Sequence, residues 1–287
     1  MKVSVSSYSF SQQIWAGKMT QLDCVAKAKE MGFDAIEFTD IAGDDLAQQK
    51  AYAQQIREEA DRVGIEINAY TIGANLFQPT AEAQAAEVER LKGQVEVAAI
   101  LGAKVMRHDV CYSLGKTGAS RSFGLMLPTI AEGARQVTAY AETYGIKTCT
   151  ENHGYIAQDS YRVEQLFNAV AHDNYGLLVD IGNFVCADED PAMAVSRVAP
   201  YAVHVHLKDM LYRSAPSGNC RNMTRGGNYF CGTVVGEGDV PVKQCLRIIK
   251  ATGYDGFISL EYEGAEDCLT GIARGLANVK RFLEELQ

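Results

Sequence analysis

The stretch "EMGFDAIEF", residues 30–38, joins the end of a helical pattern to a short apolar strand through one glycine. Glycine closes a helix at low cost because it adopts the left-handed backbone conformation without a steric penalty. The same order of helix end, glycine and strand recurs in "RVGIEINAY", "ILGAKVMRH", "TYGIKTCTE" and "ATGYDGFISL", which begin at residues 62, 100, 143 and 251. This recurrence predicts a chain of alternating helices and strands.

Eight short apolar runs favour β-strands. They are residues 3–7, 34–38, 64–70, 103–108, 146–151, 175–180, 202–207 and 256–261. Helix starts are marked by capping signals at Thr20 and at Asp190, which precedes a proline. Eight strands alternating with helices predict an α/β protein, a (β/α)8 TIM barrel that forms one domain over residues 1–287. A doubly wound sheet is the alternative, but no glycine-rich phosphate loop follows the first strand.

The composition restricts the compartment and the binding partners that we expect for the protein. Apolar residues make up 47 % of the chain, and the net charge of −9 disfavours nucleic acid and anionic membranes as partners. No apolar run reaches the ~18 residues of a membrane helix, and the N-terminal residues lack the apolar core of a signal peptide. The eight cysteines include no CxxC pair. We therefore expect a reduced cytoplasmic protein, with a Cys220–Cys231 disulfide as the less favoured alternative.

Polar residues mark the carboxyl ends of the fifth to eighth predicted strands. Glu151, Asp180 and Glu261 close three of them, and His206 lies near the end of the seventh. Strand ends at this face of a barrel carry functional residues. Three carboxylates gathered there would repel one another without a cation. We therefore expect one divalent metal ion bound by these four residues. Their donor set suits Mn²⁺, with Mg²⁺, Fe²⁺, Co²⁺ and Zn²⁺ as alternatives.

Residues near these four are candidates for contacts with a substrate. His204, His206 and Lys208 alternate along the seventh strand and therefore point to one side of it. We expect His204 to lie one layer deeper, as a supporting residue, and Lys208 to reach the mouth and bind a substrate oxygen. Arg107 and His108 end the fourth strand and point in opposite directions, and we assign His108 to the substrate site.

The roles of several other polar or aromatic features are less specific. His153 either contacts substrate or caps a loop, and Glu37 is a candidate to bind a distal substrate hydroxyl. Trp15 either packs on a sugar ring or seals the barrel. The long polar segment 210–239 is a lid over the site, a subunit interface or a tolerated insertion. Its three arginines are candidates to bind a phosphate or carboxylate: Arg213, Arg221 and Arg225.

Five motifs carry a resemblance to a known family. They are "ENHG" (151–154), "LVDIGN" (178–183), "HVHLKD" (204–209), "GEGDVP" (236–241) and "ISLEYEG" (258–264). With them the chain resembles the sugar phosphate isomerase/epimerase superfamily, which consists of xylose isomerase-like TIM barrels. That superfamily includes ketose 3-epimerases and inosose dehydratases. The resemblance covers essentially the whole chain.

The resemblance implies a function and roles for individual residues. Glu151, Asp180, His206 and Glu261 match the family's Mn²⁺ ligands, and the two glutamates match its acid and base. Asn183 stands where ketose 3-epimerases have a substrate-binding histidine, and we assign it to the substrate site.

The implied activity is isomerisation or epimerisation of a sugar or sugar derivative through a metal-stabilised enediolate, with a small-molecule sugar as the partner. A metal-dependent lyase or dehydratase acting on an inosose or 3-keto-sugar is one alternative. A non-catalytic carbohydrate-binding barrel is another. The sequence does not decide whether the protein forms a homo-oligomer.

Overall fold

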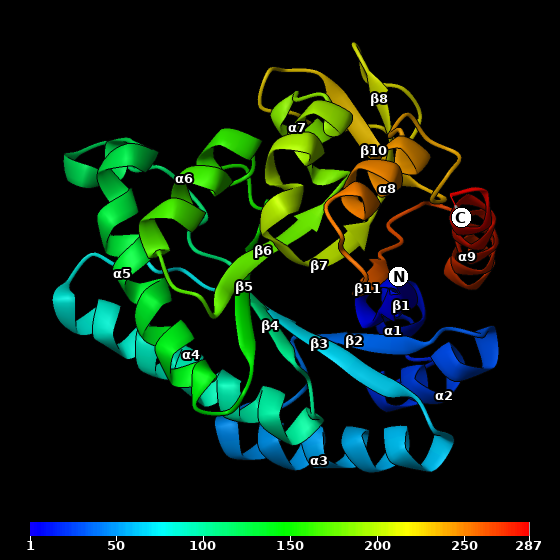
Figure 1. The fold of residues 1–287 in the computed structure, drawn as a ribbon, viewed down its shortest axis with the longest axis horizontal. Coiled ribbons are helices and arrows are strands. Elements are labelled where there is room, and N and C mark those ends of the chain that lie inside the picture. The colour runs from blue at the N-terminus through cyan, green and yellow to red at the C-terminus, as the bar shows by residue number, and fades with distance from the viewer. Residues whose placement is uncertain (287) are drawn as a thin grey trace.

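A closed barrel of eight parallel strands forms the centre of the molecule in the computed structural model, which describes residues 1–286 (Figure 1). The strands around the barrel are β1 (Lys2–Ser6), β2 (Ala35–Thr39), β3 (Glu66–Ile72), β4 (Val105–His108), β5 (Lys147–Glu151), β6 (Tyr175–Asp180), β7 (Ala202–Leu207) and β11 (Phe257–Leu260). Each pairs with its neighbours in chain order, and β11 pairs with β1 to close the ring. The predicted TIM barrel and its eight strands are confirmed.

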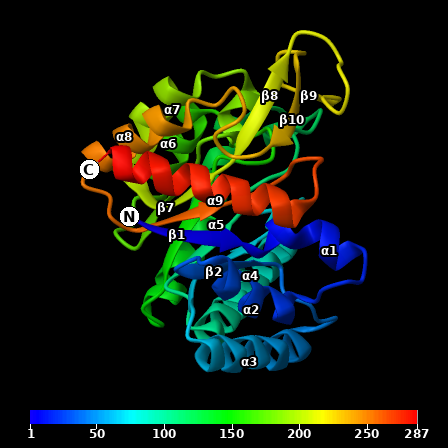
Figure 2. The ribbon, with the colours of Figure 1, turned by 90° about the vertical axis from the view of Figure 1, so that its right-hand side faces the viewer.

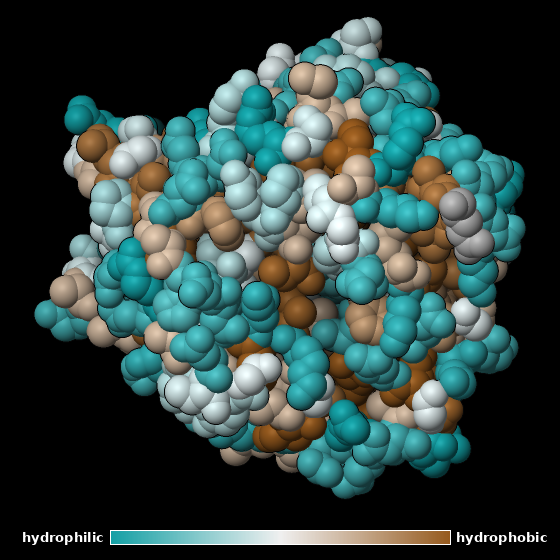
Figure 3. Space-filling model, in the orientation of Figure 1, coloured by the Kyte–Doolittle hydropathy of each residue, from teal (hydrophilic) through white to brown (hydrophobic). Residues whose placement is uncertain are grey.

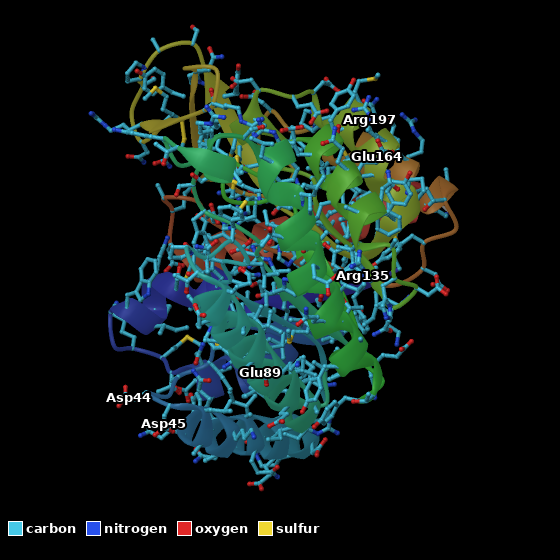
Figure 4. All side chains as sticks on the ribbon, turned by 90° about the vertical axis from the view of Figure 1, so that its left-hand side faces the viewer. Asp44, Asp45, Glu89, Arg135, Glu164 and Arg197 are labelled. Carbon is cyan, nitrogen blue, oxygen red and sulfur yellow. A yellow bond between two sulfur atoms is a disulfide. The ribbon has the colours of Figure 1, made fainter. Side chains whose placement is uncertain are left out.

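Helices surround the barrel (Figures 1 and 2). They are α1 (Ser11–Trp15), α2 (Gln21–Met31), α3 (Leu46–Val63), α4 (Ala81–Leu101), α5 (Phe123–Glu142), α6 (Ser160–Val170), α7 (Pro191–Val198), α8 (Val242–Ala251) and α9 (Cys268–Glu285). The labelled charged residues Glu89, Arg135, Glu164 and Arg197 lie on the outer helices α4 to α7 (Figure 4). Teal, hydrophilic residues cover most of the face in Figure 3, and brown, hydrophobic residues form small groups between them.

Local sequence signals explain where the helices begin and end. Thr20 and Asp23 form a capping box at the start of α2, and Asp190 accepts a hydrogen bond from the Met193 amide at the start of α7. Gly32 and Gly64 end α2 and α3 with φ of 86° and 69°, in the left-handed region that favours glycine. The helix–glycine–strand pattern therefore has the structural basis that the sequence predicts.

The segment 210–239 contains secondary structure of its own. Strands β8 (Asp209–Arg213), β9 (Asn222–Met223) and β10 (Tyr229–Thr233) form a small antiparallel sheet in the order β8-β10-β9. We call residues 209–233 the hairpin sheet. Figure 2 shows it projecting beyond the barrel.

A disulfide links Cys220 to Cys231 within the hairpin sheet, with their Cα atoms 4.4 Å apart. The expectation that these two cysteines stay apart and reduced is therefore wrong. The antiparallel pairing of β9 with β10 brings the two residues together, and the sequence spacing alone does not reveal that pairing. The other six cysteines are free and buried.

The helices of the described residues include no candidate for a membrane-spanning segment. None formed by residues 1–286 combines the length and apolar character that a membrane crossing needs.

Candidate metal centre and substrate cavity

A cavity of about 280 Å³ opens at the carboxyl ends of the barrel strands. Most of its lining residues are polar or charged. They are Tyr8, Thr39, Asp40, Thr71, Gly73, Arg107, Asp109, Glu151, His153, His206, Lys208, Glu261 and Glu263. Residues from β2, β3, β4, β5 and β7, and from the segments that follow β1 and β11, therefore meet at one point, as expected for the functional face of a TIM barrel.

The four predicted metal ligands lie together, and three of them, Glu151, His206 and Glu261, line this cavity. One donor atom from each of Glu151, Asp180, His206 and Glu261 lies within 4.8 Å of the others, and all four residues are buried. The Nδ1 atom of His206 is 3.7 Å from Glu151 Oε1, 3.8 Å from Asp180 Oδ2 and 3.5 Å from Glu261 Oε2. The side chains therefore converge on one small volume.

Two buried polar atoms in this cluster have no hydrogen-bond partner among the described residues. They are Nδ1 of His206 and Oδ2 of Asp180, which face each other. A buried polar atom without a partner carries a desolvation cost. A divalent cation would satisfy both atoms, and three carboxylates with one imidazole form a suitable donor set for it. The residues present therefore fit a divalent metal.

The electrostatics of the cluster agree with this fit. Burial raises the pKa of Asp180, and the charges of Glu151 and Glu261 raise it further against the opposing effect of Lys208. Burial would also raise the pKa of Glu151 and Glu261. Arg107 and His206 nevertheless hold the pKa of Glu151 well below its usual value, and Lys208 and His206 do the same for Glu261. Both glutamates are therefore charged at neutral pH.

Glu37 fixes the orientation of His206. This fully buried carboxylate in the middle of β2 contacts His204 Nε2 at 2.5 Å and His206 Nε2 at 2.9 and 3.0 Å. With Nε2 of His206 occupied by Glu37, Nδ1 is the nitrogen that faces the cluster. The structure therefore gives Glu37 a position below the site, away from any distal substrate hydroxyl. His204 lies in the deeper layer that the strand alternation predicts.

Arg107 lines the cavity, and His108 does not. The Nη2 atom of Arg107 is 2.8 Å from Asp109 Oδ1 and 2.7 Å from Glu151 Oε2. His108 is fully buried on the other side of β4, with Nδ1 2.9 Å from the Asp109 carbonyl, and burial lowers its pKa. The assignment of His108 to the substrate site is corrected. The neighbouring carboxylates draw the arginine inward, because they offset the cost of burying its charge.

The other three predicted substrate residues lie in or beside the cavity. Lys208 Nζ is 2.7 Å from Glu261 Oε2 and 3.0 Å from Glu263 Oε1. Asn183 donates from Nδ2 to Glu151 Oε1 at 2.9 Å. His153 Nδ1 lies 3.0 Å from Asp109 Oδ1, and this contact raises its pKa although burial alone would lower it.

Several residues that line the cavity were not predicted from the sequence. Thr39 and Thr71 place hydroxyls 2.9 Å apart on β2 and β3, opposite the charged half of the site. Glu263 lies two positions after Glu261, a spacing that could have identified it.

The three arginines of the segment 210–239 do not line the cavity within the described part of the chain. Arg213 pairs with Asp239 at 2.8 Å, and Arg225 pairs with Asp159 at 2.7 Å. Arg221 donates to the Gly218 carbonyl at 3.2 Å. Trp15 is 74 % exposed, so it does not seal the barrel.

Comparisons with known proteins agree with the fold. The profile of the xylose isomerase-like TIM barrel family matches residues 25–286. An inosose dehydratase of Clostridium perfringens is 25 % identical over 138 residues, which are 47 % of this chain and 46 % of that protein. The chain thus aligns with about half the length of this curated relative.

Solved structures have the same fold at low identity. A D-tagatose 3-epimerase-like protein superimposes with a TM-score of 0.73 at 21 % identity, covering 100 % of this chain and 98 % of the other. A xylose isomerase-like TIM barrel protein from Mycobacterium smegmatis in complex with magnesium gives a TM-score of 0.73 at 18 % identity, again covering 100 % and 98 %. The family profile spans nearly the whole chain, and the protein therefore belongs to the xylose isomerase-like TIM barrel family.

Proposed function

We propose that the protein is a divalent-metal-dependent isomerase or epimerase of a sugar or sugar derivative. The observation that carries the proposal is the cluster of Glu151, Asp180, His206 and Glu261, three of which line a polar cavity. A divalent ion bound by these residues, with Mn²⁺ preferred, would act as a Lewis acid that polarises a substrate carbonyl. Family membership supports the proposal, because the proteins similar to this chain include an inosose dehydratase and a D-tagatose 3-epimerase-like protein.

Two carboxylates flank the place where the substrate would react. Glu151 is held by Arg107 and Asn183, and Glu261 is held by Lys208. One glutamate removes a proton from the carbon next to the carbonyl, which gives an enediolate, and the other returns a proton from its own side. Arg107 and Lys208 keep Glu151 and Glu261 ionised, because they hold the pKa of each glutamate below its usual value. Return to the same carbon epimerises the substrate, and return to the neighbouring carbon isomerises it.

The lining of the cavity favours an uncharged substrate. Arg107 and Lys208, the two strong cations of the lining, are already paired with carboxylates. The opposite half presents the hydroxyls of Thr39 and Thr71 together with Asp40. These groups hydrogen-bond to the hydroxyls of a polyol, and they offer no cation for a phosphate. We therefore propose a neutral polyhydroxylated ketone or aldose as the substrate.

A dehydratase is the second candidate. Asn183 occupies the position of the histidine that the ketose 3-epimerase pattern requires, and the curated relative reported above is an inosose dehydratase. The same proton abstraction, followed by loss of the hydroxyl on the next carbon, would eliminate water. The cavity residues serve both outcomes, because the first step is common to them.

The test is proton–deuterium exchange in D₂O, followed by NMR with Mn²⁺-loaded and then Mg²⁺-loaded protein over a panel of ketoses, inososes and keto-sugars. We expect exchange of the hydrogen next to the carbonyl with at least one neutral ketone. Glu151→Gln and Glu261→Gln should each lower the rate at least about 100-fold, the scale of general acid–base catalysis. Mass spectrometry separates the candidates, because epimerisation preserves the mass apart from deuterium and dehydration loses water. Binding of a sugar without exchange of any ketone would leave the carbohydrate-binding barrel as the function.

A further inference from the structure

A second recess of about 280 Å³ adjoins the metal cavity. Its lining residues come from the segment after β1 and the segment after β11. They are Tyr8, Ser9, Ser11, Gln12, Trp15, Tyr262, Glu263 and Gly264. Tyr8 and Glu263 line both spaces and therefore form the boundary between them. Each space alone falls just below the ~300–1,000 Å³ of typical ligand sites, and the two together fall within that range.

Trp15 is the feature of this recess that needs an explanation. It ends α1, a helix with no buried residue, and 74 % of its surface is exposed. The Tyr8 ring meets it edge to face, with centroids 6.3 Å apart at 82°. A single exposed apolar residue is common, but here two aromatic rings line one recess, and one of them, Tyr8, also lines the metal cavity. Aromatic rings at such a place offer a flat apolar surface for a ligand.

The walls of the recess are fixed by hydrogen bonds between the first and last loops of the barrel. Gln12 donates to the carbonyls of Gly264 and Glu266, both at 3.0 Å, and accepts from the Cys268 amide at 3.0 Å. Ser9 Oγ donates to the Leu260 carbonyl at 3.2 Å and accepts from the Tyr262 amide at 2.9 Å. Because these polar groups are already hydrogen-bonded within the protein, the recess is preformed. What it offers a ligand is mainly the aromatic pair.

We propose that the substrate has two rings, with a keto-sugar in the metal cavity and a second, glycosidically linked ring in the recess against Trp15 and Tyr8. This inference rests on the proposed function and narrows its substrate class to keto-glycosides. A glycosidic bond locks the anomeric carbon, so the carbonyl must be a ketone on another ring carbon. Oxidation of a ring hydroxyl must therefore supply the substrate, and the glutamates act on the hydrogen next to that ketone.

The sole tryptophan of the chain reports directly on the recess. The probes are 3-keto-glucose and a disaccharide that contains the same 3-keto ring, 3-keto-trehalose, each titrated into Mg²⁺-loaded protein. We expect the disaccharide to shift the Trp15 emission to shorter wavelength and to bind at least about tenfold more tightly than the monosaccharide, the range of one aromatic contact. Equal affinities, or equal shifts with both probes, would overturn the second ring site.

A variant pair tests the same point by specificity. Trp15→Ala should lower the ratio of kcat/KM for the disaccharide to that for the monosaccharide about tenfold. Met193→Ala, which truncates a 67 % exposed side chain on α7, should leave the ratio unchanged. An unchanged ratio in Trp15→Ala contradicts the inference. Absence of deuterium exchange with every ketone, combined with selective Trp15 shifts, would refute the proposed reaction and keep the two-ring site.

Discussion

Glu37 is the residue that joins the barrel interior to the candidate metal centre. It contacts both His204 and His206 through their Nε2 atoms, so the Nδ1 atom of His206 is the one directed to the cluster. A carboxylate in this position fixes the tautomer of a ligating histidine and increases its basicity. The metal affinity should therefore depend on a residue that does not touch the metal.

We expect Glu37→Gln to weaken Mn²⁺ binding about 10- to 100-fold, because the amide provides only one acceptor for two histidines. Isothermal titration calorimetry on metal-free protein measures the change. Asp209→Asn is the matched control. Asp209 is also buried, but its carboxylate accepts from the amides of Met210, Gly236, Gly238 and Val240. The control should lower the melting temperature and keep the Mn²⁺ affinity. Wild-type affinity in Glu37→Gln would contradict this role.

The pH dependence of metal binding follows from His206. Burial alone would lower its pKa, but Glu37, Glu261 and Glu151 raise it well above the usual value. Below that raised pKa the imidazole holds a proton that a metal must displace, so the affinity should rise with pH and level off above it. We expect about a tenfold gain per pH unit in the rising region, which corresponds to release of one proton. Calorimetry in two buffers of different ionisation enthalpy counts the protons. A count of zero at pH 7 would contradict the assignment of His206.

At the residue scale, the convergence of the four candidate ligands could be predicted because each lies at or next to the carboxyl end of a strand, and these ends of a barrel meet. The inward position of Arg107 could not be predicted, because Arg107 and His108 are neighbours and either alternation of β4 was compatible with the sequence. The contact of Glu37 with both His204 and His206 could not be predicted, because the sequence does not show that β2 lies across the barrel from β7.

At the scale of elements, the hairpin sheet is anchored to the barrel by Asp188. Its Oδ1 atom accepts hydrogen bonds from Tyr212 at 2.9 Å, Thr224 at 2.7 Å and Asn228 at 2.9 Å. Arg225 adds a contact to Asp159. The sequence predicted a long functional loop here. It could not show a folded sheet, because two-residue β9 has no periodicity to detect.

We expect Asp188→Ala to detach the hairpin sheet, because three side-chain donors lose their shared acceptor. Limited trypsin digestion should then cleave after Arg221 or Arg225 faster than in the unmodified protein. Asp44→Ala, which removes an exposed aspartate before α3, should leave the digestion rate unchanged. Mn²⁺ affinity should be retained in both variants, since the candidate ligands lie outside the sheet. Unchanged cleavage in Asp188→Ala would show that other contacts hold the sheet.

At the scale of the whole molecule, the ring closes where the first barrel strand meets the last. Val3 is opposite Ile258 and Val5 is opposite Leu260 in the β1–β11 pair. The alternation of eight strands with helices predicts this closure, although nothing local in either segment encodes its partner. Every barrel strand has two neighbours, so the barrel should unfold cooperatively.

We expect Ile36→Ala in β2 and Ile258→Ala in β11 each to lower the free energy of unfolding by about 2–5 kcal/mol, because both side chains are fully buried. Urea titrations followed by far-ultraviolet circular dichroism and by metal release should give one coincident transition for each variant. Separate transitions for the two probes would show that parts of the barrel unfold independently.

The spread of the cluster along the chain has a consequence for biosynthesis. Its residues come from β2, β5, β6, β7 and the position after β11, so Glu37 is made early and Glu261 late. A growing polypeptide on the ribosome holds an incomplete donor set until residue 261 has emerged and β11 has entered the ring. Under the proposed function, the full set of four ligands would be available to a metal only near the end of translation. Metal occupancy would then report that the barrel is finished.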